Sequence, residues 1–237
     1  MTTFALVHGA WHGGWCWDRV RPRLEADGHR VVAPDLPCDD PGAGVEEYAG
    51  VVGQALEAAG ADDDVVVVGH SLGGLTIPLV AARRPVRSLV FLCAVLAEPG
   101  RVPWQVVMEG DGFVPGFPGE GAIETHDDGT NSWRPEAAAS AFFHDCSDED
   151  AAWAASMLRR QAGRPSNDPW PIDAWPDVPK VQVLCRDDRA IAAGFSRGPG
   201  ARILGVDPSD VVELDGGHSP FLAQPDRLAE VLRRVGV

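Results

Sequence analysis

The hydrophobic positions of the chain follow two alternating periods. Short runs rich in β-branched residues, such as the four consecutive valines at 65–68, are separated by longer stretches in which apolar residues recur three and four positions apart. A run without polar alternation is expected for a central parallel strand that is buried on both faces. Near the end of the chain, Leu228, Val231, Leu232 and Val235 form one stripe at helical spacing. This alternation predicts a parallel sheet built from strand–helix–strand units.

The predicted elements are six strands and four helices. The strands are expected over 4–8, 30–34, 65–69, 88–94, 181–185 and 211–214, and the helices over 17–26, 45–59, 71–82 and 225–235. The pattern therefore predicts an α/β protein with a mostly parallel central sheet of about six strands, flanked by helices.

The alternation stops between about residues 97 and 175. The first half of this stretch is rich in Gly and Pro, and its second half contains one clear helix. Ser147 is the expected N-cap, acidic residues occupy the first turn, and Arg159 and Arg160 are expected at the end. Because the strand pattern resumes near residue 181, we interpret 97–175 as a small cap inserted over the sheet. It is not an independent domain, and residues 1–96 and 176–237 form the core.

Length and charge narrow the classes of function. A chain of 237 residues suits one well-buried domain. Its 20 basic and 35 acidic residues give a net charge of −15. Such a surface repels phosphate backbones and anionic lipid headgroups, so nucleic-acid and membrane-surface binding are not expected.

The cysteines and the N-terminal sequence indicate a compartment. Five cysteines lie far apart, without metal-site spacing, and an odd number does not suit a complete disulfide framework; they are Cys16, Cys38, Cys93, Cys146 and Cys185. The first residues lack a signal peptide, and no apolar run reaches membrane-spanning length. We expect a cytoplasmic protein with buried, reduced thiols; its oligomeric state, monomer or homodimer, is left open.

The strongest chemical signal is the pentapeptide Gly69-His70-Ser71-Leu72-Gly73. It matches the G-x-S-x-G nucleophile motif, and it follows a predicted strand and precedes a predicted helix, as that motif requires. A sharp turn at this point raises a serine hydroxyl above the sheet, and the glycines leave room where side chains would collide. The motif predicts Ser71 as the nucleophile of an acyl-transfer enzyme.

A serine nucleophile needs a general base and an acid that orients it. His218 follows the last predicted strand and comes after the serine, in the order Ser…acid…His typical of this motif. The acid is expected where the strand at 181–185 ends, and Asp187 and Asp188 both satisfy that position. Either aspartate could instead pair with Arg186 or Arg189 at the surface.

The backbone amides of Leu72 and Ala10 are the expected oxyanion hole. Leu72 follows the nucleophile, and Ala10 lies in the His8–Trp11 loop after the first strand, the position from which the second donor comes.

These motifs together resemble one branch of the α/β-hydrolases, which contains the hydroxynitrile lyases and the plant methyl esterases, including salicylate methyl esterases. The resemblance rests on the segments 6–17, 24–29, 68–74, 146–150 and 216–218, and so extends over nearly the whole chain. It implies a Ser-His-Asp triad in which the acid is Asp188.

Two differences favour the esterase side of that branch. The lyases have a lysine directly after the catalytic histidine, where this chain has Ser219, and the only lysine here is Lys180. The lyases also have an acidic residue before the serine and a cysteine after it, where this chain has His70 and Leu72.

Eight tryptophans against one tyrosine raise the question of an aromatic pocket. Trp11 beside the oxyanion loop, and Trp104 and Trp133 in the insertion, are the candidates for substrate binding. Simple packing beneath the cap is the competing interpretation, because tryptophan is most often a core residue.

The sequence thus predicts a serine hydrolase of small carboxylic esters that works through an acyl-enzyme and needs no cofactor or metal. Hydrolysis of a C–C bond or a lactone by the same triad is the alternative within enzymes. A ligand-binding homologue with little turnover is the alternative outside them. The segments around His126 and His144 lack the spacing of a metal site.

Overall fold

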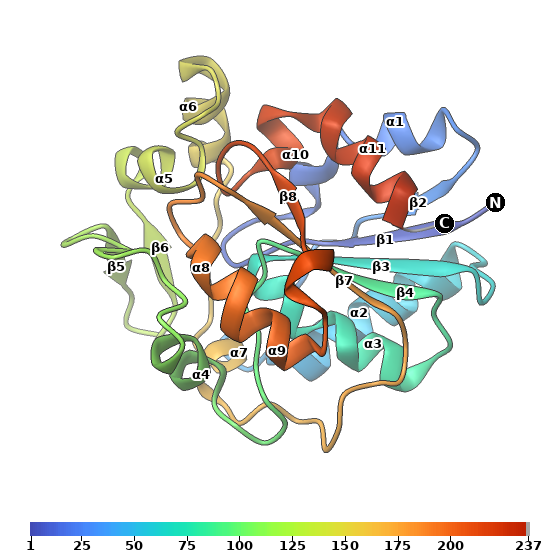
Figure 1. The fold of residues 1–237 in the computed structure, drawn as a ribbon. Coiled ribbons are helices and arrows are strands. Elements are labelled where there is room, and N and C mark those ends of the chain that lie inside the picture. Colours follow the sequence, from blue (N-terminus) through green and yellow to red (C-terminus); the bar gives the residue numbers. More distant parts are fainter. Residues whose placement is uncertain (236–237) are drawn as a thin grey trace.

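A six-stranded parallel sheet crosses the centre of the molecule (Figure 1). The computed structural model describes residues 1–235. The strands are β1 (Thr3–Val7), β2 (Arg30–Val32), β3 (Val65–His70), β4 (Ser88–Leu92), β7 (Lys180–Cys185) and β8 (Val212–Leu214). Their order is β2-β1-β3-β4-β7-β8, and each neighbouring pair is parallel. The predicted α/β class and six-stranded sheet are confirmed.

Helices cover both faces of this sheet (Figure 1). One face carries α1 (Arg21–Glu25), α10 (Pro220–Ala223) and α11 (Pro225–Val235), and the other carries α2 (Val45–Ala58), α3 (Ile77–Arg83), α8 (Ala193–Phe195) and α9 (Ala201–Leu204). Successive side chains of a strand point to opposite faces. Phe4 and Leu6 therefore pack with α1 and α11, while Ala5 and Val7 pack with α2 and α3.

Two helices that were expected to be continuous are divided. The 3₁₀ helix η1 (Gly14–Trp17) precedes α1, and the 3₁₀ helix η2 (Ser71–Leu75) precedes α3. Pro22 and Pro78 stand in the first turns of α1 and α3, where a missing N–H costs least and where a new helix commonly begins. Two further short turns are the π-helical η3 (Ser196–Gly200) and the 3₁₀ helix η4 (Pro208–Asp210).

The chain between β4 and β7 lies beside the carboxyl ends of the strands (Figure 1). Its elements are α4 (Pro103–Glu109), β5 (Ile123–Thr125), β6 (Asn131–Trp133), α5 (Pro135–Phe142), α6 (Asp148–Ser156) and α7 (Arg164–Asn167). β5 and β6 form an antiparallel pair. Within residues 1–235 we find no helix with the length and apolar character needed to cross a bilayer.

The helix expected after Ser147 is present but shorter. The Ser147 hydroxyl accepts a hydrogen bond from the Asp150 amide at 3.2 Å, so the N-cap is confirmed. The helix ends at Ser156, and Arg159 and Arg160 are therefore not in its last turn. The Arg159 amide instead donates to the Trp11 carbonyl at 2.6 Å, and its side chain binds the Leu36 carbonyl at 3.0 Å. Contacts with the core thus end the helix early.

Candidate active site

Ser71 stands at a sharp turn between β3 and η2, with a backbone φ of +50°. Positive φ is uncommon for a residue with a side chain, and it is the strained conformation expected of a nucleophile elbow. Neighbouring glycines allow the turn to pack tightly. A Cβ atom on Gly69 would lie 2.7 Å from the Gly73 carbonyl oxygen, and one on Gly73 would lie 2.8 Å from the Val7 carbonyl oxygen.

His218 and Asp188 form a buried pair at the same edge of the sheet. His218 Nδ1 donates to Asp188 Oδ2 at 2.8 Å, and each side chain is only 2% exposed. Asp188 Oδ1 accepts from the amides of Ala190 at 2.7 Å and Ile191 at 3.0 Å, which fixes the carboxylate. Because Nδ1 is the donor, Nε2 is the ring nitrogen that can accept a proton.

Asp187 lies outside this arrangement. Its side chain is exposed, and the only hydrogen bond of that side chain within the described residues is accepted from the Gly216 amide at 3.3 Å. Adjacent residues that leave a strand point in opposite directions, so only one of the two aspartates faces His218.

His70 connects the turn of Ser71 with the loop of His218. Its Nε2 donates to the His218 carbonyl oxygen at 2.9 Å, and the two rings lie 4.6 Å apart. No hydrogen bond joins Ser71 Oγ to His218 in the described part of the chain. Catalytic contacts of this kind often shorten only when substrate aligns the side chains.

Three more histidines are buried around this site and are held neutral. Burial lowers the pKa of His8 to about 4 and that of His12 to about 3, and it lowers the pKa of His70 well below its usual value. His12 Nδ1 donates to the Ala10 carbonyl at 2.7 Å, and its side chain is buried. Its ring stacks on Trp15, which packs against the hydrophobic core.

A pocket of about 280 Å³ opens beside Ser71. Its walls come from the first loop, the turn of Ser71, the segment between β4 and β7 and the loop after β7, and none of the residues that line it is charged. Trp11 and Trp104 line this pocket, and their contact with substrate stays a prediction. Trp133 lies behind Trp11, in an edge-to-face contact at 5.6 Å, so direct substrate contact by Trp133 stays a prediction.

Sequence reasoning missed most of the pocket wall. The missed lining residues include Phe113, Phe117, Phe142, Asn131 and Gln161. They are spread over almost fifty positions of a segment without a clear period, so no local signal marks them. Phe142 also approaches His218, with the ring centres 5.4 Å apart.

One group of metal-ligand side chains occurs within residues 1–235. Cys93, Asp188 and His218 bring their ligand atoms within 4.8 Å of one another. Asp188 and His218 already use these atoms on each other. The group is therefore explained by the histidine–aspartate pair, and the absence of a metal cofactor stays a prediction.

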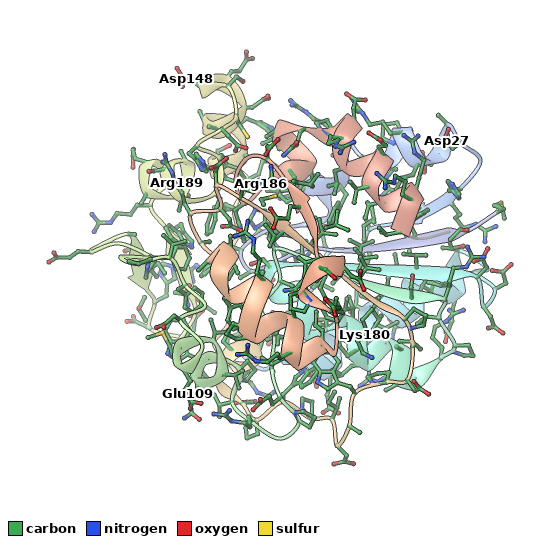
Figure 2. The ribbon with its side chains drawn as sticks, in the orientation of Figure 1. Asp27, Glu109, Asp148, Lys180, Arg186 and Arg189 are labelled. Carbon is green, nitrogen blue, oxygen red and sulfur yellow. The ribbon has the colours of Figure 1, made fainter. Side chains whose placement is uncertain are left out.

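The single lysine lies far from this edge of the sheet. Lys180 is the first residue of β7, whereas Arg186 directly follows its carboxyl end; both are labelled in Figure 2. A strand of six residues spans roughly 20 Å, so the Lys180 ammonium is remote from His218.

Comparison with known proteins agrees with this geometry. Residues 4–231 match the model of the alpha/beta hydrolase family. A pyrethroid hydrolase of Sphingobium wenxiniae is 32% identical, with 98% of this chain and 86% of that protein covered. An alpha-hydroxynitrile lyase of Arabidopsis thaliana is also 32% identical, with 98% and 96% covered.

A solved structure extends the likeness to three dimensions. The crystal structure of a pyrethroid hydrolase from Sphingobium faniae JZ-2 has a TM-score of 0.78 at 30% identity, covering 99% of this chain and 97% of that chain. Plant methylesterases are also among the relatives, which confirms the resemblance to the lyase and methyl-esterase branch. The chain belongs to the alpha/beta hydrolase family.

Proposed function

We propose that this protein is a serine hydrolase of small, uncharged carboxylic esters. The observation that carries the proposal is the buried hydrogen bond between His218 and Asp188, at the edge of the sheet where Ser71 is held at positive φ beside an apolar pocket. A nucleophile, a base and an orienting acid are the parts that acyl transfer requires.

Each residue of the triad has one role. Ser71 Oγ attacks the ester carbonyl while His218 Nε2 takes its proton, and Asp188 holds the imidazole in the tautomer that leaves Nε2 free. The same histidine then gives the proton to the departing alcohol, leaving an acyl-enzyme. Water attacks this ester in a second step, again with His218 as base, and releases the acid.

The amides of Ala10 and Leu72 form the proposed oxyanion hole. Both residues line the pocket next to Ser71. The neighbouring Trp11 amide already donates to Gln161 Oε1 at 3.2 Å, whereas the Ala10 amide makes no hydrogen bond to any residue in 1–235. A free amide beside the nucleophile is available for the charge that develops on the carbonyl oxygen.

The substrate is an uncharged ester with an apolar body. No charged side chain of the pocket would stabilise an ionic substrate, and a net charge of −15 would repel an anionic one. Trp11, Trp104 and Trp133 are the proposed aromatic contacts, with residues 97–175 acting as the cap. Relatives named as a pyrethroid hydrolase and as methylesterases support ester cleavage, and Ser219 in the place of the lyases' lysine favours it over the lyase reaction.

A cytoplasmic location remains part of the proposal. It is supported by the five cysteines, which are all free thiols, four of them buried. Reduced thiols are the usual state in the cytosol.

The test is covalent labelling of the serine with a fluorophosphonate probe, followed by turnover of a panel of small esters. We expect wild-type protein to be labelled and to hydrolyse at least one apolar ester, and Ser71→Ala to do neither. Failure of wild-type protein to react with the probe would remove the proposal.

A further inference from the structure

The turn that contains the proposed oxyanion donor Ala10 is held by a side chain from the cap. We propose that Gln161 is a positioning residue, which keeps this turn in the conformation that leaves the Ala10 amide free to bind the oxyanion. The inference rests on the proposed function, because it concerns the oxyanion hole of that site.

Residues Gly9 to His12 form a turn with an unfavourable backbone. The His12 amide donates to the Gly9 carbonyl at 3.4 Å, and Trp11, in the third position, has a φ of +62°. Positive φ at this position is typical of type II turns, in which glycine is the preferred residue. Because tryptophan has no such preference, contacts from outside the turn must hold it.

Contacts from the segment 131–161 hold Trp11 at three points. Its amide donates to Gln161 Oε1 at 3.2 Å, its carbonyl accepts the Arg159 amide at 2.6 Å, and its indole Nε1 donates to Asn131 Oδ1 at 2.7 Å. The Asn131 contact fixes the ring. The Gln161 contact fixes the peptide between Ala10 and Trp11.

That peptide is held at both ends. Its carbonyl, from Ala10, accepts His12 Nδ1 at 2.7 Å, and its N–H meets Gln161. Reversal of the peptide would relieve the positive φ of Trp11, since it converts a type II turn into a type I turn. It would also turn the Ala10 carbonyl oxygen towards Gln161, placing a negative dipole end at this wall of the pocket, where the oxyanion needs donors.

The orientation of the Gln161 amide is fixed. The residue is 4% exposed, and its Nε2 donates to the Tyr48 hydroxyl at 3.1 Å and to the Ala162 carbonyl at 2.9 Å. A carbonyl can only accept, so Nε2 must face Ala162 and Oε1 must face Trp11. Backbone bonds at 2.8 and 2.9 Å between Gln161 and Asn131 hold the main chain in the same place.

The experiment compares two replacements of Gln161. Gln161→Met keeps the length of the side chain but removes the carbonyl acceptor. Gln161→Glu keeps an acceptor for the Trp11 amide, and because burial raises the pKa of a carboxyl group, its second oxygen is expected to carry a proton and to donate to the Ala162 carbonyl as Nε2 does. Loss of an oxyanion donor costs about 10²–10³ in kcat. Gln161→Met keeps the Ala10 amide and only loosens the turn that positions it, so we expect a smaller loss. Both kcat for a p-nitrophenyl ester and the rate of fluorophosphonate labelling should fall by about 10–100-fold. We expect KM of Gln161→Met to stay within about twofold of wild type. We expect kcat of Gln161→Glu to be about tenfold higher than that of Gln161→Met.

Tyr48→Phe is the matched control. It removes the partner of Gln161 Nε2 and leaves the bond to Trp11, so labelling should stay within about threefold of wild type. Thermal unfolding establishes that the variants are folded. If Gln161→Met does not fold, Gln161→Asn, which withdraws the amide by one methylene, carries the same expectation.

The outcomes separate the two proposals. Wild-type rates in Gln161→Met, a loss confined to KM, or no recovery in Gln161→Glu would each overturn the positioning role and leave the serine hydrolase intact. A wild-type protein that neither reacts with the probe nor cleaves esters would overturn the hydrolase, and the role of Gln161 with it.

Discussion

The carboxyl edge of the sheet and the segment that covers it are built in different ways. At the edge, Ser71, Asp188 and His218 each lie within four residues of the end of a strand, so the parallel register of the sheet brings them to one place. In the covering segment, short helices and a hairpin contribute single side chains to an uncharged pocket wall. We therefore propose that the residues at the sheet edge carry the chemistry and that the covering segment, the proposed cap, selects the substrate.

Replacement of the nucleophile is the strongest test of this division. We expect Ser71→Ala to reduce hydrolysis of a small p-nitrophenyl ester by about 10⁵-fold or more, because removal of the serine leaves only binding and the oxyanion hole. Circular dichroism should show unchanged secondary structure, since only one hydroxyl is lost. A variant that kept a tenth of the wild-type rate would place the nucleophile elsewhere.

The second test concerns the orienting acid. Asp188→Asn should lower kcat by up to ~10⁴-fold, because an amide in this place can stabilise the wrong tautomer of His218. Asp187→Asn is the matched control and should keep most of the activity, since Asp187 is exposed. Steady-state rates of the two variants, measured side by side, decide the assignment; the reverse order of effects would move the acid by one residue.

The third test concerns stability, because the histidines buried beneath the site belong to the core and not to the cap. The folded pKa values of His8 and His12, about 4 and about 3, lie below the unfolded value of about 6.5. Between these values the unfolded chain binds protons that the folded chain does not. The contribution of these two neutral histidines to the stability of the folded protein is thus fully present above pH 6.5, and it is lost as the pH falls towards 4 for His8 and towards 3 for His12.

Urea unfolding at a series of pH values measures this loss. On the order of 3 kcal/mol of the fall in the free energy of unfolding should come from His8, and on the order of 5 kcal/mol from His12, each over its own pH range. His12→Asn removes one of them, and its side-chain amide can still donate to the Ala10 carbonyl. Its curve should be flatter than that of the wild type below pH 6.5. If the free energy of unfolding of the variant and the wild type changed with pH in parallel, His12 would have the same pKa in the folded and the unfolded chain.

The smallest expected effects come from the cap. Trp104 is 44% exposed and packs against Phe113 at the pocket, with the ring planes tilted by 39° and the ring centres 4.9 Å apart. Trp104→Ala should therefore change KM by about 3–10-fold for larger aromatic esters, with kcat and stability nearly unchanged. Trp133→Ala is the contrasting variant, because Trp133 is buried and its loss should cost about 3 kcal/mol of stability. Equal effects of the two changes on KM would assign Trp133 a direct contact with substrate.

The sequence alone determined the six strands and the elbow motif. Both depend on short-range patterns: a run of β-branched residues selects a buried strand, and glycines around a serine allow a turn that larger residues cannot enter. It also restricted the orienting acid to two adjacent positions. The resemblance to a known branch, and not the spacing of residues, favoured Asp188, and the hydrogen bond to His218 Nδ1 agrees with it.

Only the tertiary structure decided the pocket wall and the support of the oxyanion loop. Gln161 contacts Trp11 across 150 positions of sequence, and Asn131 does so across 120. Such contacts depend on how the segment between β4 and β7 folds over the sheet, and no local period of the chain encodes that path. The early end of α6 has the same origin, because Arg159 makes its contacts with Trp11 and Leu36 in place of a further helical turn. The division of the expected helices is different, because it accompanies Pro22 and Pro78, which are local signals of the sequence.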